Sequence, residues 1–89
     1  KPFNKIPINV ILIEKWFKIR GFKTKKNIVI FILTYLGYDT TKINTSSNLK
    51  KIIKVYQSHY LQKNVTGKID PITYRFLFKH FISLLLTKI

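Results

Sequence analysis

The sequence predicts a single all-α domain, and three features of the chain predict it. Apolar residues recur at helical spacing in four segments, which are separated by polar stretches containing Gly or Asp. Residues 66–69 could form a short extended piece, but no other segment offers a strand partner by alternation. The 89 residues suit one domain, and the apolar share of 46% is enough for its core.

The first two predicted helices are bounded by recognisable end signals. The first spans about residues 8–19, with Pro7 at a first-turn position and Gly21 suited to the stop. It is apolar on most sides, so we expect it to pack against another element. The second spans about residues 25–36, with Thr24 as N-cap and Gly37 after its last apolar residue. We expect its buried face to comprise Ile28, Phe31, Ile32, Tyr35 and Leu36.

The last two predicted helices flank a polar turn. A loop at residues 38–45 precedes a third helix that Ser46 or Ser47 opens. Its core face follows the i, i+3, i+4, i+7 pattern at Leu49, Ile52, Ile53, Tyr56 and Tyr60. A turn at residues 63–68 follows, and Asp70 with Pro71 then marks a helix start. The buried face of that helix is expected to hold Tyr74, Leu77, Phe78, Phe81 and Leu85.

The net charge of +14 raises the possibility of a polyanionic partner, but composition explains most of it. Lysine (15), isoleucine (15) and asparagine (6), which are encoded by AT-rich codons, make up 36 of the 89 residues. Arginine occurs only as Arg20 and Arg75, although its planar fork is the usual means of recognising phosphate or guanine. The sequence therefore makes no strong case for nucleic acid.

The chain contains few residues of the types that carry out catalysis. There is no cysteine, the only acids are Glu14, Asp39 and Asp70, and the only histidines are His59 and His80. Catalytic zinc needs three protein ligands, and general-acid catalysis of the paired-carboxylate kind needs two acids close together. We expect the chain by itself to be neither an enzyme nor a metal-binding protein.

Because the chain contains no methionine and begins at Lys1, we also expect a fragment or a processed chain. No apolar run approaches the roughly 20 residues that span a bilayer.

Residues 49–77 carry a more specific pattern than a generic pair of helices. An apolar helix contains Tyr56-Gln57, a loop carries Thr66-Gly67-Lys68-Ile69-Asp70, and Thr73 and Leu77 follow at fixed steps. This order resembles the peptidoglycan-binding domain family. Many members of that family have a Gly in the turn after the glutamine helix, whereas this chain has none until Gly67.

Two further features resemble one subgroup of that family. Gly37-Tyr38-Asp39 follows the second predicted helix, and His59 stands two residues after Gln57. They look like the C-terminal domain of zinc-dependent N-acetylmuramoyl-L-alanine amidases of the periplasmic, outer-membrane-attached kind. The resemblance implies a three-helix bundle at residues 24–89, with residues 1–23 forming a linker and an additional N-terminal helix.

The resemblance also implies a function and a location. The chain would be a non-catalytic cell-wall-binding domain that targets an N-acetylmuramoyl-L-alanine amidase, a hydrolase, to peptidoglycan. Its partners would be peptidoglycan and a covalently linked catalytic domain, which would hold the zinc, and this chain itself would hold no cofactor. The location would be the bacterial cell envelope, in the periplasm or associated with the outer membrane. The alternatives are a basic nucleic-acid-binding module using Lys50, Lys51 and Lys54, and a structural or dimerising domain using Trp16, Phe17 and residues 81–86.

Candidate ligand-binding residues gather around the predicted turn: Gln57, Tyr60, Lys63, Thr66, Gly67, Lys68 and Tyr74. Tyrosine rings can lie flat on sugars, and lysines can pair with the carboxylates of peptidoglycan stem peptides. The alternative is structural: half-buried core tyrosines, solvated lysines and a buried Gln57 amide that holds the loop. Gly37, Asp70, Pro71 and Thr73 are predicted structural markers, with Asp70 acting as a helix cap.

Overall fold

Four helices form the fold of the described part of the chain, residues 8–41 and 46–87 of a computed structural model. They are α1 (Val10–Ile19), α2 (Lys25–Tyr35), α3 (Ser46–Tyr60) and α4 (Pro71–Thr87). No strand occurs among these residues, so the all-α prediction is confirmed. Within the same residues, no helix combines the length and the apolar character needed to cross a membrane.

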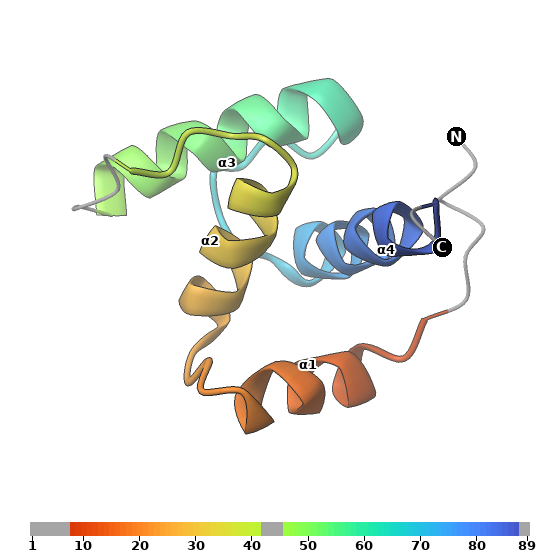
Figure 1. The fold of residues 1–89 in the computed structure, drawn as a ribbon. Helices are drawn as coiled ribbons and strands as arrows, with labels where there is room; N and C mark the ends of the chain where they lie inside the picture. The colour runs from red at the N-terminus through yellow and green to blue at the C-terminus, as the bar shows by residue number, and fades with distance from the viewer. Residues whose placement is uncertain (1–7, 42–45, 88–89) are drawn as a thin grey trace.

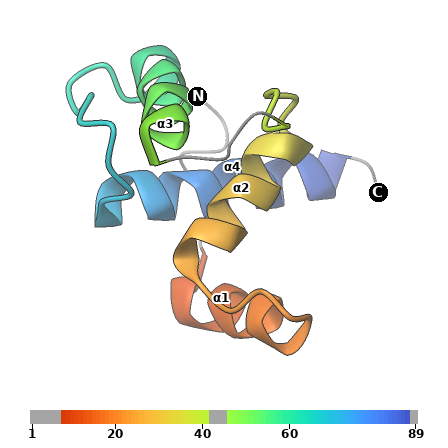
Figure 2. The same cartoon turned by 90° about the vertical axis from the view of Figure 1, so that its left-hand side faces the viewer.

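Helix α4 is the central element of the arrangement. α1 and α3 lie on opposite sides of it, and α2 crosses it between them (Figures 1 and 2). α4 contacts both α1 and α2, so the first and the last helix pack on the same core. The loop between α3 and α4 runs along the edge of this assembly and delivers the chain to the first turn of α4 (Figure 2).

The helix ends follow local chemistry. Asn9 caps α1 by accepting a hydrogen bond from the N–H of Leu12 at 3.2 Å, so the helix begins two residues later than predicted. The predicted first-turn role of Pro7 lies outside the described residues. Thr24 caps α2 as predicted, through the N–H of Asn27 at 3.2 Å. Gly37 follows α2 with φ +101°, a conformation that only glycine adopts readily, which explains its place at this stop.

Phe17 of α1 lies at the centre of an aromatic cluster that joins α1, α2 and α4. Its ring stacks on Phe78 at 6.0 Å between centroids and lies 5.6 Å from Phe81. Phe22 and Phe31 contact the same ring edge-on. Because Phe17 has no exposed surface, it cannot contribute to a dimer surface, and that part of the dimerisation hypothesis is wrong.

The predicted core faces are largely correct for α3 and α4. Leu49, Ile53 and Tyr56 of α3 are buried, and so are Tyr74, Leu77, Phe78 and Phe81 of α4. The prediction for α2 was partly correct: Ile28 and Ile32 are fully buried as expected, but Val29 and Leu33 are fully buried too, and Phe31 is 38% exposed. α2 crosses α4 with α1 and α3 on its two flanks, and this crossing determines which of its apolar residues are covered.

Candidate functional site

Gln57 of α3 joins the α3–α4 loop to the start of α4. Its side chain is fully buried, and its Oε1 accepts hydrogen bonds from the N–H groups of Thr66 at 2.9 Å and Gly67 at 2.8 Å. Its Nε2 donates to Thr73 Oγ1 at 2.8 Å, and also lies 3.2 Å from Thr66 Oγ1 and 3.3 Å from the carbonyl of Lys68. Gln57 therefore holds the loop in place, in agreement with the structural alternative for this residue and not with a direct ligand contact.

Gly67 fits closely beneath two lysines of α3. Its φ is +74°, and a Cβ built there would lie 2.7 Å from Lys50 Cγ and 3.1 Å from Lys54 Cε. A side chain at this position would strain the backbone and displace the lysine stems. Gly67 is thus a buried structural residue. Its N–H donates a hydrogen bond to Gln57 Oε1, so this group is not free to contact a ligand.

Asp70 caps α4, as predicted. Its Oδ1 accepts from the N–H of Thr73 at 2.8 Å, and its Oδ2 accepts from the Thr66 hydroxyl at 3.0 Å and from Asn64 Nδ2 at 3.1 Å. Pro71 is the first residue of the helix, where no N–H is needed. Burial by itself would raise the pKa of the Asp70 carboxyl, but the hydrogen bonds from Thr73, Thr66 and Asn64 together hold that pKa below its ordinary value of 3.8.

The lowered pKa of Asp70 predicts a loss of stability in acid. A carboxyl whose pKa is lower in the folded state stabilises the fold above its unfolded pKa, here 3.8, and that contribution disappears as the pH falls through the folded pKa. We expect the free energy of unfolding, measured by urea titration, to decline below about pH 4 less steeply in Asp70→Asn than in the natural chain. Asparagine still caps a helix, so the variant folds. Parallel pH profiles for the two chains would contradict the assignment.

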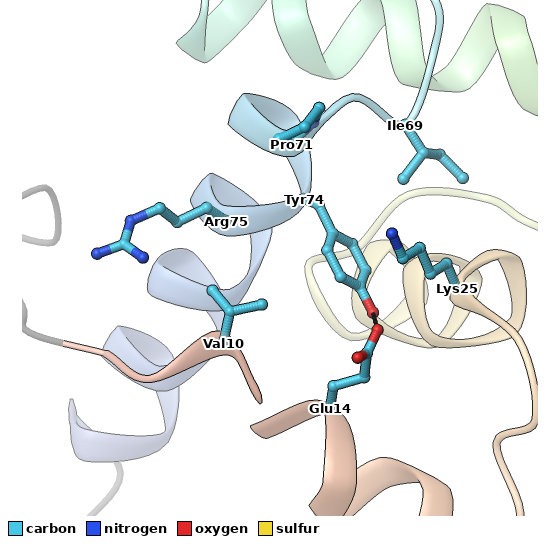
Figure 3. A pocket seen from close by; sticks show the side chains of 7 residues that line it. All are labelled: Val10, Glu14, Lys25, Ile69, Pro71, Tyr74 and Arg75. Atoms are coloured by element: carbon cyan, nitrogen blue, oxygen red, sulfur yellow. Dashed lines mark hydrogen bonds between the residues drawn. The ribbon is translucent and has the colours of Figure 1, made fainter. Parts of the chain in front are cut away.

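A pocket of about 340 Å³ opens beside this loop, where α1, α2 and the first turn of α4 meet (Figure 3). Its lining residues are Val10, Glu14, Lys25, Ile69, Pro71, Tyr74 and Arg75. The Tyr74 hydroxyl donates to Glu14 Oε2 at 2.7 Å, and Lys25 Nζ lies 5.2 Å from the centroid of the Tyr74 ring. Burial, together with the Glu14 carboxylate, raises the pKa of Tyr74, so the phenol stays protonated and keeps donating.

The pocket combines charged groups of both signs with an apolar wall. Lys25 and Arg75 supply two cations on opposite sides of Tyr74, with the Arg75 guanidinium directed away from Lys25, and Glu14 supplies one carboxylate (Figure 3). Ile69 and Pro71 belong to the segment that the Gln57 network positions, so the network also fixes part of the pocket wall. Such a lining suits a ligand that carries a carboxylate beside small apolar groups.

The structure distributes the predicted ligand-binding residues over different places. Tyr74 lines the pocket, whereas Tyr60 lies on the other side of α4, with its ring 4.8 Å from that of His80. Thr66 is committed to the Gln57 and Asp70 bonds. Lys63 and Lys68 are exposed on the turn and do not line the pocket. The predicted residues therefore do not form one continuous ligand surface.

Sequence reasoning missed Lys25, Arg75 and Glu14 as pocket residues. Lys25 follows a helix cap and Arg75 follows a buried tyrosine, and neither position differs locally from a solvated surface charge. Glu14 offered the one available signal, because it is one of only three acids in a chain with 17 cationic residues. Its partner, Tyr74, lies 60 residues away in the sequence.

No metal centre is visible in residues 8–41 and 46–87, where no three His, Cys, Asp or Glu side chains are grouped to hold an ion. In comparisons with known proteins, no family model, no curated protein and no solved structure matches this chain. The relationship to peptidoglycan-binding domains therefore stays a hypothesis that depends on the residues and contacts of the chain itself.

Proposed function

We propose that this chain is a non-catalytic peptidoglycan-binding domain that keeps a zinc-dependent N-acetylmuramoyl-L-alanine amidase on its polymeric substrate. One observation carries the proposal. Five of the residues that carry the resemblance, Gln57, Thr66, Gly67, Asp70 and Thr73, meet in a single hydrogen-bonded network around the buried Gln57 side chain. In this proposal, the spacing of the five residues along the sequence is the spacing that lets each of them reach its hydrogen-bond partner in the network. In the same proposal, α2, α3 and α4 correspond to the three-helix bundle of the family, and α1 is the additional helix.

The pocket beside Tyr74 is the docking place we propose. Stem peptides of peptidoglycan carry carboxylates, which suit Lys25 and Arg75, and small alanine methyl groups, which suit the wall of Ile69 and Pro71. Glu14 is already engaged by Tyr74, so it keeps that ring in position in the lining of the pocket. This location replaces the exposed turn lysines Lys63 and Lys68 as the main contact.

The benefit to the enzyme would be effective concentration. Weak docking of a tethered domain on a polymer raises the local concentration of cleavable amide bonds at the active site. The zinc and the hydrolytic chemistry belong to the covalently linked catalytic domain in this proposal. The proposed setting is the bacterial cell envelope, in the periplasm or at the outer membrane.

Sedimentation with insoluble peptidoglycan sacculi tests the proposal. The purified chain is mixed with sacculi at about 0.15 M and about 0.5 M salt, with cellulose and DNA-cellulose as controls. We expect co-sedimentation with sacculi that persists at the higher salt. Binding to DNA-cellulose alone would favour the nucleic-acid alternative, and binding to every matrix that disappears with salt would reduce the interaction to the net charge of +14.

A pair of charge-matched variants tests the pocket itself. Lys25→Ala combined with Arg75→Ala is expected to weaken binding to sacculi about tenfold, if each partly exposed ion pair contributes about 0.7 kcal/mol. The control combines Lys26→Ala with Lys51→Ala, which removes the same charge from exposed positions outside the pocket. Equal weakening by both pairs would show that the pocket is not the contact.

A further inference from the structure

Helix α1 carries an exposed apolar stripe that the core does not use. Leu12, Trp16 and Ile19 recur at i, i+4 and i+7, and they are 63%, 44% and 74% exposed. The stripe continues into a groove of about 250 Å³ between α1 and the C-terminal half of α4, and this groove is lined by Ile13, Trp16, Phe81, Ile82 and Leu85. We call the stripe and the groove together the α1 face. Isolated exposed apolar residues are common, but a continuous set of this kind marks an interaction surface.

Two cations lie beside the α1 face. Lys15 is exposed on α1 next to Leu12 and Ile19, and the guanidinium of Arg20 lies 3.8 Å from the centroid of the Trp16 ring. The only acid of α1 is Glu14, whose carboxylate turns toward Tyr74 and the other pocket (Figure 3). Glu14 is two residues from both Leu12 and Trp16, so it lies about 160° around the helix from each of them.

We propose that the α1 face docks on an anionic phospholipid surface. Its chemistry is that of an interfacial helix: apolar side chains and a tryptophan on one side, with lysine and arginine beside them. The indole of Trp16 has an apolar body and one N–H, a combination that suits the boundary between acyl chains and headgroups. The net charge of +14 attracts the whole chain to an anionic surface.

Other occupants fit these observations less well. A second copy of the chain would have to approach against the repulsion between two chains that each carry a net charge of +14. A folded protein partner ordinarily exchanges about one hydrogen bond per 100–200 Å² of interface. The only neutral side-chain donor among the residues that form the α1 face is the indole N–H of Trp16, so contact with a disordered acyl layer suits it better.

Trp16 also makes the test direct, because it is the only tryptophan in the chain. Its fluorescence is recorded during titration with vesicles of phosphatidylcholine containing about 30% phosphatidylglycerol, and with vesicles of phosphatidylcholine alone. We expect a blue shift and quenching by brominated acyl chains with the anionic vesicles, both reduced at about 0.5 M salt. The measurement contains no peptidoglycan, so its outcome is independent of the sacculus experiment.

Matched variants test whether vesicle binding depends on the α1 face or on general adhesion of the chain to the vesicles. Leu12→Gln with Ile19→Gln is expected to weaken vesicle binding at least about tenfold, since two exposed apolar anchors are lost. Val55→Gln with Ile72→Gln is the control, because these residues are also exposed but lie on α3 and α4 outside the face. All four positions are exposed, so the variants should fold, and circular dichroism checks this.

Three outcomes would overturn the proposal. One is an unchanged Trp16 spectrum with anionic vesicles, and another is equal weakening by the two variant pairs. The third is a spectral shift that grows with protein concentration without lipid, or that appears with polyglutamate but not with vesicles. That result would assign the α1 face to a second copy or to an acidic protein.

Discussion

Replacing Phe17 with alanine is expected to lower the free energy of unfolding by about 4 kcal/mol, within the range measured for large-to-small changes at buried aromatic positions. Phe17 has no exposed surface, and its ring contacts Phe22, Phe31, Phe78 and Phe81. Three helices and the α1–α2 connection meet at this ring, so neighbouring side chains cannot close the cavity without shifting a helix. The measurement is urea denaturation followed by circular dichroism.

Two controls separate the role of Phe17 from an effect of helix α1 itself. Phe17→Leu keeps most of the volume and is expected to cost about 1.5 kcal/mol. Ile19→Ala lies on the same helix at an exposed position and should change stability by no more than about 0.5 kcal/mol. If Phe17→Ala destabilised the chain no more than Ile19→Ala does, α1 would be an appendage and would not belong to the shared core.

The helices were predictable because their signals are local. Thr24 and Asp70 each bond an N–H three residues ahead, and such caps are visible in the sequence as a residue type before an apolar run. Helical spacing likewise identified the buried faces of α3 and α4. It was less accurate for α2, where Phe31 was expected inside and Val29 was not. That helix is apolar on several sides, and only the crossing with α4 decides which of them is covered.

The candidate site was only partly predictable, for a related reason. The Gln57 network lies within 16 residues of sequence around one loop, so the spacing of its members indicated that they belong together. The pocket instead brings Glu14 and Lys25 to Tyr74 from two other helices. Periodicity identifies which face of a helix is buried, but it does not say which faces meet. Tyr60 and Tyr74 therefore looked alike in sequence, although they lie on different sides of α4.

Gln57→Leu is expected to destabilise the chain by about 3 kcal/mol, although leucine fits a buried position and nearly preserves the volume. The change leaves the Gly67 N–H and the Thr73 hydroxyl buried without their partner, and each unsatisfied group costs about 1–3 kcal/mol. Thr66 and Lys68 are exposed, so water replaces their lost bonds at small cost. Gln62→Leu is the matched control, because Gln62 is exposed, and we expect a change of no more than about 0.5 kcal/mol.

Amide hydrogen exchange shows whether the effect of Gln57→Leu arises in the loop. In the natural chain the Gly67 N–H is buried and bonded to Gln57 Oε1 at 2.8 Å, so it should exchange slowly. Gln57→Glu keeps an acceptor for Thr66 and Gly67 but loses the donor to Thr73, and we expect slow exchange at Gly67 with intermediate stability. A Gly67 amide that stays protected in Gln57→Leu would mean that the loop holds its shape without the glutamine. The network would then lose its place as the feature that positions Ile69 and Pro71 on the pocket wall, and with it the main structural support for the peptidoglycan-binding proposal.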